Sequence, residues 1–323
     1  MTSLISWMES AGLATPWFFV GLFLAASLLM IWRLEAMAAG GMEGTVLGTL
    51  IMPYCTGMGN LIFAIVLGLR GGSGAEVVTN CLVNNVTNLT LLLGVPAAIW
   101  GLSVADTKQD SARQRNRLSM LLTLCAVLFF TGTAWAMGRR EIGFADGLVL
   151  IGLFLCWQAF HVVEVLKSNR RQNKSFGWML AVDLILLGIG AYGTYLSTDW
   201  LVAWVSNIKT GFISASYLGW LSGWLDVLPN GLLAFYYGRK RQAEVVYTSQ
   251  VGDGHICIPL CLGVFALFRP IVVPPFFQTG VMILGAVTLV HLIFIGAWGR
   301  LPRIVGWILT AAYGIFLYQG LIK

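Results

Sequence analysis

Charged residues are scarce in this sequence. Asp, Glu, Lys and Arg together make up 11% of the 323 residues, whereas soluble domains carry about 25%. Hydrophobic residues make up 58% of the chain, and its mean hydropathy is +0.80. This composition excludes a soluble globular enzyme and predicts an integral membrane protein whose surroundings are the lipid bilayer.

The motifs of catalysis and of metal-binding enzymes are also missing. The chain has three His and six Cys, but no Cys-x-x-Cys, H-E-x-x-H, P-loop or Ser-His-Asp arrangement. The cysteines lie inside apolar runs, so we interpret them as free apolar side chains. The net charge of +6 comes from short loops between apolar segments, which argues against nucleic acid as a partner. We therefore predict a protein without enzymatic activity or cofactor.

Long apolar segments are abundant, and a membrane-spanning helix needs about 20 such residues. Ten candidates follow one another along the chain: 16–32, 43–69, 75–103, 117–137, 143–166, 176–197, 200–238, 243–268, 274–298 and 302–321. Segment 200–238 is too long for one straight span, so we expect 200–208 to form an interfacial stretch before the seventh helix. The sequence predicts an all-α, polytopic membrane protein.

The distribution of basic residues gives the orientation. With the N-terminus outside, fourteen of the twenty Lys and Arg fall in the five cytoplasmic loops, and six fall elsewhere. This bias supports ten spans with both termini non-cytoplasmic. The hydrophilic loop around residues 167–174 divides the chain into halves 1–168 and 175–323. Because each half has an odd number of spans, the halves are expected to be inverted relative to each other.

An internal repeat occurs at corresponding places in the two halves. An offset of 170 residues aligns Asn60 with Asn230, and AEVV occurs at both 75–78 and 243–246. We assign the repeats to residues 41–94 and 211–263. Each contains two apolar segments interrupted by Gly, Pro and polar residues, which is the best sequence indication of a transporter's binding site.

Glycine and proline interrupt the first segment of each repeat. Pro53, Gly57 and Gly59 lie in the second span, and Gly223, Pro229 and Gly231 lie in the seventh. Irregular backbone at membrane depth is tolerated only inside protein or beside a cavity. We therefore predict broken helices at spans 2 and 7, although glycine and proline also serve close helix packing.

The second segment of each repeat supplies side-chain oxygens. Asn80, Asn84, Asn85, Thr87 and Asn88 crowd one stretch of the third span. Their counterparts in the eighth span are Thr248, Ser249, Gln250, Asp253 and His255. Asp226 and Asp253 are the acidic residues that lie well inside these spans, and an ionisable group in hydrocarbon marks a functional site by default.

Other polar residues are weaker candidates. Glu43, Glu76 and Glu244 lie at span ends, where we expect solvated caps rather than an ion vestibule. His161 and Glu164 are interpreted as a local pair, and His291 as a residue making one hydrogen bond in an apolar span.

These motifs resemble those of the cation/calcium antiporter superfamily, the group of sodium/calcium exchangers. That family has ten spans in two inverted five-helix halves, with a G-T-S-x-P-E type motif and a G-N-x-x-G-S-N (or D) motif in each repeat. Thr56-Gly-Met-Gly-Asn60 and Asp226-Val-Leu-Pro229-Asn230 occupy the first motif in the two halves. Asn80 with Asn84-Asn85, and Gly252-Asp253, fit the second.

The sequence departs from the family in its ligands. Both family glutamates fall on asparagine, Asn60 and Asn230, and the threonine of the second half falls on Asp226. Calcium prefers about 6–8 hard oxygen ligands that include carboxylates. The altered set is equally suited to Ca²⁺, Na⁺, a proton-coupled monovalent cation or another solute.

The resemblance implies a secondary active antiporter that exchanges Na⁺ or H⁺ for Ca²⁺ or another cation by alternating access. The expected ion-binding residues are Thr56, Asn60, Asn84, Asn85, Asp226, Asn230 and Asp253, of which Asp226, Asp253, Asn60 and Asn230 contact the metal ion. The resemblance also implies that the first and sixth spans slide against the rest. The economical loops suggest the cell membrane and no obligate protein partner.

Two alternatives remain open at this point. The same fold exports a different solute, either a small organic one or a metal-bound one. Alternatively, the missing glutamates mark a transport-inactive protein that serves as a membrane interaction or sensor protein.

Overall fold

The protein is almost entirely helical. The computed structural model describes residues 12–39, 57–104, 110–138, 141–172 and 178–322. Its elements are η1 (Gly12–Ala14), α2 (Thr15–Ala39), α5 (Met58–Leu69), α6 (Gly74–Thr87), η3 (Asn88–Leu92), α7 (Leu93–Trp100), β1 (Leu102–Ser103), α8 (Asp110–Met137), α9 (Phe144–Gln172), α10 (Met179–Ser206), η5 (Ala215–Tyr217), α11 (Leu218–Arg239), α12 (Ala243–Ile256), η6 (Cys257–Cys261), α13 (Leu262–Phe268), α14 (Phe277–Trp298), β2 (Arg300–Leu301) and α15 (Arg303–Leu321). The predicted all-α class is confirmed.

Seven helical segments in the described residues are long and apolar enough to cross a membrane. They are Gly12–Arg33, Gly74–Trp100, Met120–Met137, Ala181–Ser206, Ala243–Phe268, Phe277–Trp298 and Arg303–Leu321. Two shorter apolar helices, Met58–Leu69 and Phe144–Phe160, add to these. Helix α11 is long enough but carries Asp226, Pro229 and Asn230, which lower its hydropathy. The total of ten spans therefore stays a prediction.

The outward faces of the helices are apolar. On α15, Ile304, Trp307 and Ile308 follow one another at helical spacing and are 60–71% exposed. Met282, Leu289 and Ile293 lie on one face of α14 and are 47–61% exposed. In water such a surface would cause association, whereas in a bilayer it is the expected lipid-facing surface.

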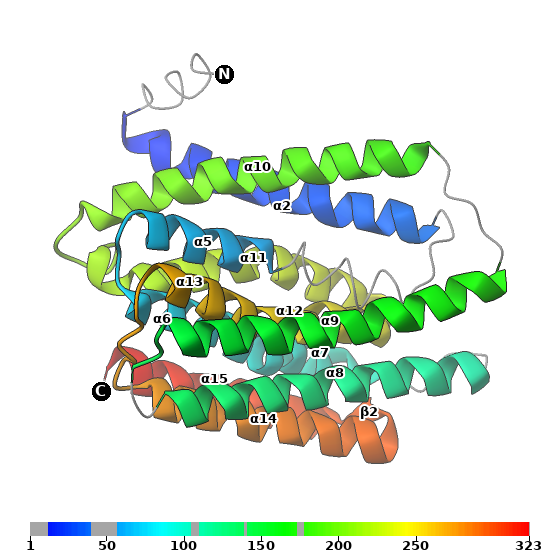
Figure 1. Cartoon of the computed structure of the whole chain (residues 1–323). Coiled ribbons are helices and arrows are strands. Elements are labelled where there is room, and N and C mark those ends of the chain that lie inside the picture. Colours follow the sequence, from blue (N-terminus) through cyan, green and yellow to red (C-terminus); the bar gives the residue numbers. More distant parts are fainter. Residues whose placement is uncertain (1–11, 40–56, 105–109, 139–140, 173–177, 323) are drawn as a thin grey trace.

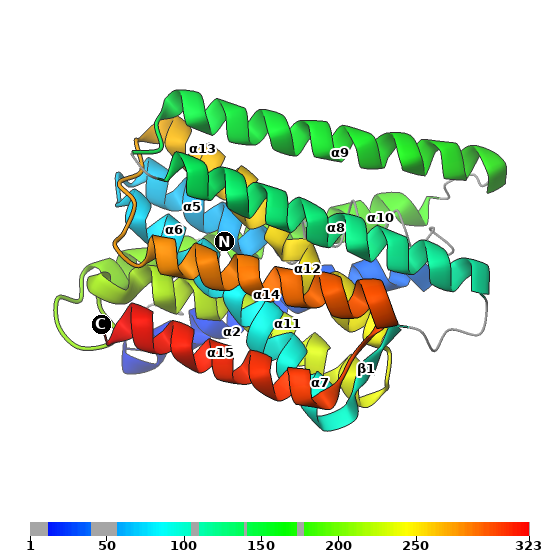
Figure 2. The ribbon, with the colours of Figure 1, turned by 90° about the horizontal axis from the view of Figure 1, so that it is seen from below.

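The helices lie roughly along one common direction (Figure 1). Helices α2 and α10 lie side by side along one side of the molecule (Figure 1). On the far side, α8 packs against α14 and α14 against α15, as Figure 2 shows from below. The repeat helices α5, α6, α11 and α12 are enclosed between these two groups. They form the core of the protein and carry many of its buried polar side chains, including Asp226 and Asp253.

Two helical segments of the repeats each contain a π-helical turn. The turn η3 lies between α6 and α7, and the turn η6 lies between α12 and α13. The offset of 168 residues that aligns Ala75 with Ala243 maps η3 onto 256–260, one residue before η6. Prolines accompany both turns: Pro259 lies within η6, and Pro96 lies one turn after η3. A proline removes one backbone hydrogen bond, and π turns are frequent at functional sites.

Corresponding elements of the two repeats make corresponding contacts. Helix α7 packs against α15, and its counterpart α13 packs against α9. Just beyond α7, Leu102 pairs with Leu301 in the antiparallel β1–β2 ladder. Just beyond α13, Ile271 pairs with Ile142 in an isolated antiparallel bridge. Strand β1 and helix α13 appear at opposite ends of the molecule in Figure 2.

The break predicted in the seventh span is wrong. Helix α11 continues through Pro229 without interruption, because one proline removes a single backbone hydrogen bond and a continuous helix tolerates that loss in a membrane. Gly223 serves close packing instead, since a Cβ there would lie 2.8 Å from Val83 Cβ and 3.0 Å from Asn80 O on α6. In the second span, Pro53 lies outside the described residues, and α5 begins directly after Gly57.

The interfacial stretch predicted at 200–208 is also wrong, because α10 continues through Ser206. The aromatic side chains in this stretch face other rings instead of marking a break. Trp200 stacks on Phe19 of α2 with ring centroids 4.2 Å apart, and Trp204 stacks on Trp200 at 6.1 Å. This packing extends the contact between α2 and α10.

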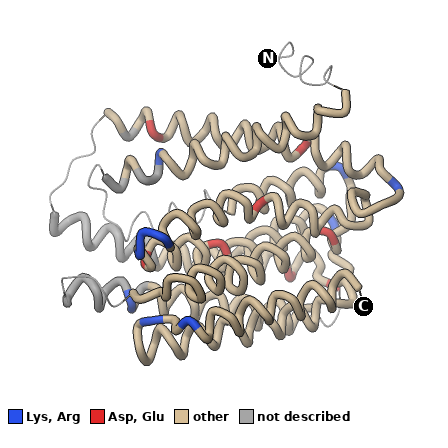
Figure 3. The backbone as a smooth tube through the Cα atoms, turned by 180° about the vertical axis from the view of Figure 1, so that it is seen from behind, with Lys and Arg blue, Asp and Glu red and all other residues tan. Residues whose placement is uncertain are grey.

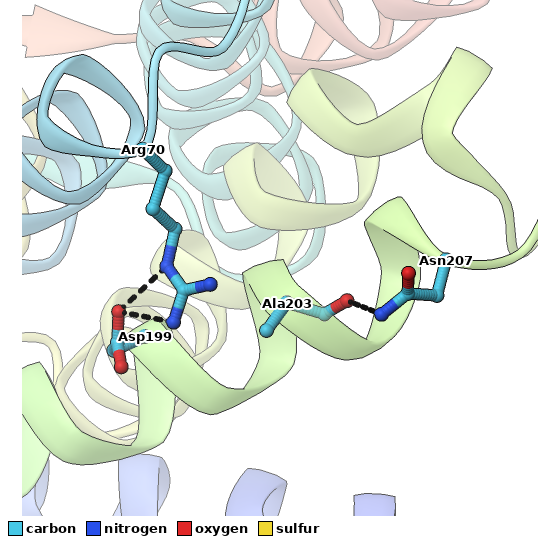
Figure 4. A network of polar contacts seen from close by, with 4 residues as sticks. All are labelled: Arg70, Asp199, Ala203 and Asn207. Carbon is cyan, nitrogen blue, oxygen red and sulfur yellow. Dashed lines mark hydrogen bonds and ion pairs between the residues drawn. The ribbon is translucent and has the colours of Figure 1, made fainter.

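Two ion pairs connect α10 to its neighbours. Arg33 Nη1 on α2 lies 3.4 Å from Asp183 Oδ1. Near the other end of α10, the guanidinium of Arg70 reaches Asp199 Oδ1 through Nε and Nη2, each at 2.8 Å (Figure 4). One turn beyond Ala203, Asn207 donates from Nδ2 to the Ala203 carbonyl at 2.9 Å (Figure 4). Arg70 ends α5, so this second pair joins α10 to the repeat core.

Basic and acidic residues are placed differently along the bundle. In Figure 3 the basic positions lie toward the ends of the helices, whereas acidic positions also occur part-way along them. Interfacial Lys and Arg agree with a membrane orientation. Acidic groups at depth require a specific role.

Candidate functional site

The predicted site residues are buried together in the repeat core. Asn60, Asn84, Asn230 and Asp253 are fully buried, Asn85 is 1% exposed and Asp226 is 4% exposed. They come from α5, α6, α11 and α12, which the close approach of Gly223 to α6 helps to hold together. Thr56 lies outside the described residues.

Asp226 is held in position by a side chain of α6. Asn80 on α6 donates from Nδ2 to Asp226 Oδ2 at 2.9 Å and to Ser222 Oγ at 3.0 Å. Ser222 precedes Asp226 by one turn of α11, so both lie on the face of α11 that meets α6. One amide group therefore fixes the position of a carboxylate and of a neighbouring hydroxyl.

Asp253 is held by two asparagines from different helices. Asn88, at the start of η3, donates to Asp253 Oδ2 at 3.0 Å, and Asn230 on α11 donates to the same oxygen at 2.5 Å. Asn88 also donates to Asn84 Oδ1 at 2.6 Å. Hydrogen bonds to a charged acceptor are each worth about 1.5–3 kcal/mol. They keep this carboxylate in one orientation at the junction of three helices.

Gly59 of α5 lies directly against Asp226. A Cβ at position 59 would clash with Asp226 Oδ1 and would lie 3.0 Å from Asp226 Cγ. Asn85 lies close to α12, because a Cβ at Gly254 would lie 3.4 Å from Asn85 Oδ1.

Several amide oxygens in this core accept no hydrogen bond within the part of the chain that the structure describes. The unpaired carbonyl oxygens belong to Asn60, Asn80, Asn85, Asn88, Asn230 and Gln250. Buried polar atoms are almost always paired, and an unpaired one costs about 1–3 kcal/mol. Amide oxygens are hard ligands of the kind that Na⁺ and Ca²⁺ accept. A cation would compensate this cost.

The charge available to a cation is limited. Within the described residues, no group of three or more His, Cys, Asp or Glu is arranged to hold a metal ion. Asp226 and Asp253 are close enough to repel each other electrostatically. The core therefore offers two carboxylates and many neutral oxygens, which suits a transported cation better than a tightly held structural metal.

Sequence reasoning missed part of this arrangement. Asn80 and Asn88 were noted for their crowding but not chosen as ion-binding residues, yet they hold the two carboxylates. Ser222 was missed, although its spacing of four from Asp226 places both on one helix face. Gln250 donates from Nε2 to the Asn230 carbonyl at 3.2 Å and so supports the seventh span.

Two weaker candidates also differ from expectation. His291 makes two contacts, with Tyr247 Oη at 3.1 Å and with the Leu89 carbonyl in η3 at 2.7 Å. Glu76 is not a solvated cap of its own helix, because its Oε2 accepts from the Gly219 amide at 2.6 Å. It caps the beginning of α11, where backbone amides lack partners.

Solved structures of the sodium-calcium exchanger NCX_Mj are similar to this chain. A structure soaked with 2.5 mM Na⁺ and 0.1 mM Sr²⁺ has a TM-score of 0.66 and 18% identity, with 94% of this chain and 96% of that chain covered. One soaked with 2.5 mM Na⁺ and 0.1 mM Ca²⁺ has a TM-score of 0.64, 19% identity and the same coverage. At this identity the likeness shows the fold. No curated protein matches the chain.

The family model described as "Sodium/calcium exchanger protein" matches residues 12–163 and 182–319. This match takes in most of both halves, including every described residue of the buried polar core. The expected family is confirmed, and with it a multi-pass membrane transporter rather than an enzyme. The chain belongs to the sodium/calcium exchanger protein family.

Proposed function

We propose that the protein is a secondary active antiporter that exchanges Na⁺ or H⁺ for Ca²⁺ or another cation at the buried core. Asp226 and Asp253 supply the charge. Thr56, Asn60, Asn84, Asn85 and Asn230 supply neutral oxygens, together with Asn80 and Asn88.

One observation carries this proposal. Among the described residues, six buried amide oxygens that accept no hydrogen bond lie in the same helical core as two buried carboxylates. Packing alone would pair such amides with one another, as Asn88 pairs with Asn84 along the continuous segment α6–η3. A desolvated cation is stabilised by contacts with amide oxygens of this kind, and its charge offsets the repulsion between the carboxylates.

Alternating access follows from two inverted five-helix halves, 1–168 and 175–323. The matched contacts of α7 with α15 and of α13 with α9 support this relation. The resemblance assigns the sliding motion to the first and sixth spans, which are α2 and α10. These two helices pack mainly on each other, so they form a unit that can shift against the core. Ten spans place both termini on the non-cytoplasmic side of the cell membrane.

The test is ion flux in proteoliposomes. Radioactive calcium uptake is measured under an imposed Na⁺ gradient and then under a pH gradient, for the wild type and for Asp253→Asn. Gradient-driven uptake by the wild type that is lost in the variant supports exchange at this site. The matched control is Glu141→Gln, which removes an exposed acidic charge outside the core.

Protonation gives a second readout. Protons compete with the cation for a buried carboxylate, so uptake is expected to fall as the pH is lowered. Uptake that is independent of pH, or that persists in Asp253→Asn, would contradict the assigned role of the carboxylates. No calcium uptake by folded wild-type protein would direct the search to another cargo.

A further inference from the structure

A cavity of about 280 Å³ lies between α2, α10 and α11, and Asp226 is part of its lining. Its walls include Trp17 and Val20 of α2, Leu201 and Val205 of α10, and Leu221 of α11. The cavity is therefore on the side of the core that faces the α2–α10 pair. Asp226 and Ser222 belong to its lining, whereas Asp253 and the asparagines that hold Asp253 do not.

The chemistry of the walls is unusual for the path of an inorganic cation. Thr198, Ser222 and Asp226 are the polar residues among those that line the cavity, and Asp226 carries the only charge. A hydrated Na⁺ or Ca²⁺ that enters must lose water, and apolar walls offer no oxygens to replace it. The apolar walls suit an apolar body, and the Asp226 carboxylate suits a positive charge.

The carboxylate is already positioned for such a ligand. Asn80 holds Asp226 Oδ2 at 2.9 Å, and Ser222 Oγ accepts from the same amide group at 3.0 Å. Neither of the ion pairs formed by α10 involves Asp226. In the described residues no Lys or Arg neutralises this acid, so a bound cation is the partner that its charge favours.

We propose that this cavity binds an organic ammonium ion with an apolar body, whose charged group pairs with Asp226 beside Ser222. The volume corresponds to about nine water-sized groups at about 30 Å³ each, so the ligand has roughly eight or nine non-hydrogen atoms. Such an ion competes with the transported cation for Asp226. This inference rests on the proposed function only in taking Asp226 as a cation ligand.

Benzylammonium is a suitable probe, because it has eight non-hydrogen atoms and carries its charge at one end. Benzyl alcohol is the neutral molecule of the same size and shape. Binding of radiolabelled benzylamine to the full chain in lipid nanodiscs is measured by equilibrium dialysis at neutral pH, with empty nanodiscs subtracted. Saturable binding is expected, and benzyl alcohol is expected to compete at least tenfold more weakly than unlabelled benzylamine.

Three variants locate the site. Asp226→Asn keeps the shape of the side chain and is expected to weaken benzylammonium binding at least tenfold. Val20→Trp fills the cavity from α2 and is expected to abolish binding without touching the carboxylate. Gly21→Trp is the matched control, because the neighbouring position faces open space and a Cβ there meets no atom within 4 Å.

The possible results separate the inference from the proposed function. Equal competition by benzyl alcohol, or full binding by Asp226→Asn and Val20→Trp, would overturn the inference and indicate partition into the membrane. Benzylammonium binding that depends on Asp226, in a protein that moves no calcium, would uphold the site while the proposed calcium exchange fails. Calcium exchange without benzylammonium binding would uphold the exchange and overturn the site.

Discussion

The substitution Gly59→Ala tests whether the contact between α5 and Asp226 sets cation affinity. The added methyl group would lie 3.0 Å from Asp226 Cγ and 3.2 Å from Phe23 Cζ, and closer still to Asp226 Oδ1. Carbon atoms pack at about 3.5–4.0 Å, so one group must move. The atoms at issue belong to the end of a side chain, and we expect the carboxylate to rotate rather than the helix to shift.

The magnitude follows from the bond that the rotation breaks. Asp226 Oδ2 accepts from Asn80 at 2.9 Å, and a hydrogen bond to a charged group is worth about 1.5–3 kcal/mol. If the loss falls on the cation-bound state, the cation concentration for half-maximal uptake rises about 10- to 150-fold. Thermal unfolding is expected to change less, because side-chain rotation relieves most of the overlap.

The assay is calcium or sodium dependence of flux in proteoliposomes, with thermal unfolding of the same preparation. Gly132→Ala is the control, because a Cβ there meets no atom within 4 Å and alanine favours a helix. Half-maximal cation concentrations within twofold of the wild type for Gly59→Ala would refute the reasoning. An equal shift in Gly132→Ala would show that the effect is not specific to Asp226.

Three further predictions concern the same helices. Asn60→Asp adds a charge without breaking a hydrogen bond to any described residue, because neither polar atom of Asn60 has a partner among them. It is expected to raise calcium affinity over sodium at least tenfold (about 1.4 kcal/mol) in ion competition, whereas Asn230→Asp loses the bond to Asp253 and is expected to lower the melting temperature. A greater gain in calcium affinity for Asn230→Asp, or a greater loss of thermal stability for Asn60→Asp, would contradict this. Glu76→Ala removes the acceptor for the Gly219 amide and is expected to cost about 0.5–2 kcal/mol of unfolding free energy. Glu76→Gln keeps an acceptor and is expected to cost less. Equal melting temperatures for the two variants would argue against a capping role of Glu76. Arg70→Gln removes an exposed ion pair worth about 0–1 kcal/mol. It is expected to leave the melting temperature nearly unchanged and to alter the exchange rate by up to about fivefold. Added salt is expected to change the exchange rate of the wild type in the same way and to leave the rate of the variant unchanged.

Much of the fold could be predicted because the bilayer imposes a strong pattern on the sequence. The length of the apolar segments predicts nearly every helix, and the two AEVV sequences lie at the beginnings of α6 and α12, which carry much of the buried polar core. The errors arose where local signals compete with packing. Pro229 and Gly223 predicted a break in α11, but the helix tolerates the proline and uses the glycine to approach α6.

The partners of the site residues were harder to predict than the residues themselves. Asp226 and Asp253 stand out because acids in apolar segments are rare. Nothing in the sequence says that Asn80 contacts Asp226, since the two are 146 positions apart. The π turns were also out of reach, because they depend on how the backbone accommodates an extra residue within otherwise regular helical sequence.

The two ion pairs of α10 have unequal consequences for a moving helix. Asp183 and Asp199 are sixteen residues apart, which is about 24 Å along a helix, so the pairs lie near opposite faces of the bilayer. In the proposed sliding motion, the Arg33 pair travels with the α2–α10 unit, whereas the Arg70 pair breaks because it joins α10 to the end of α5. An ion pair that restrains the unit on one face favours one of the two access states over the other. The ionic strength on that side of the membrane determines how strongly that state is favoured, because salt screens the ion pair.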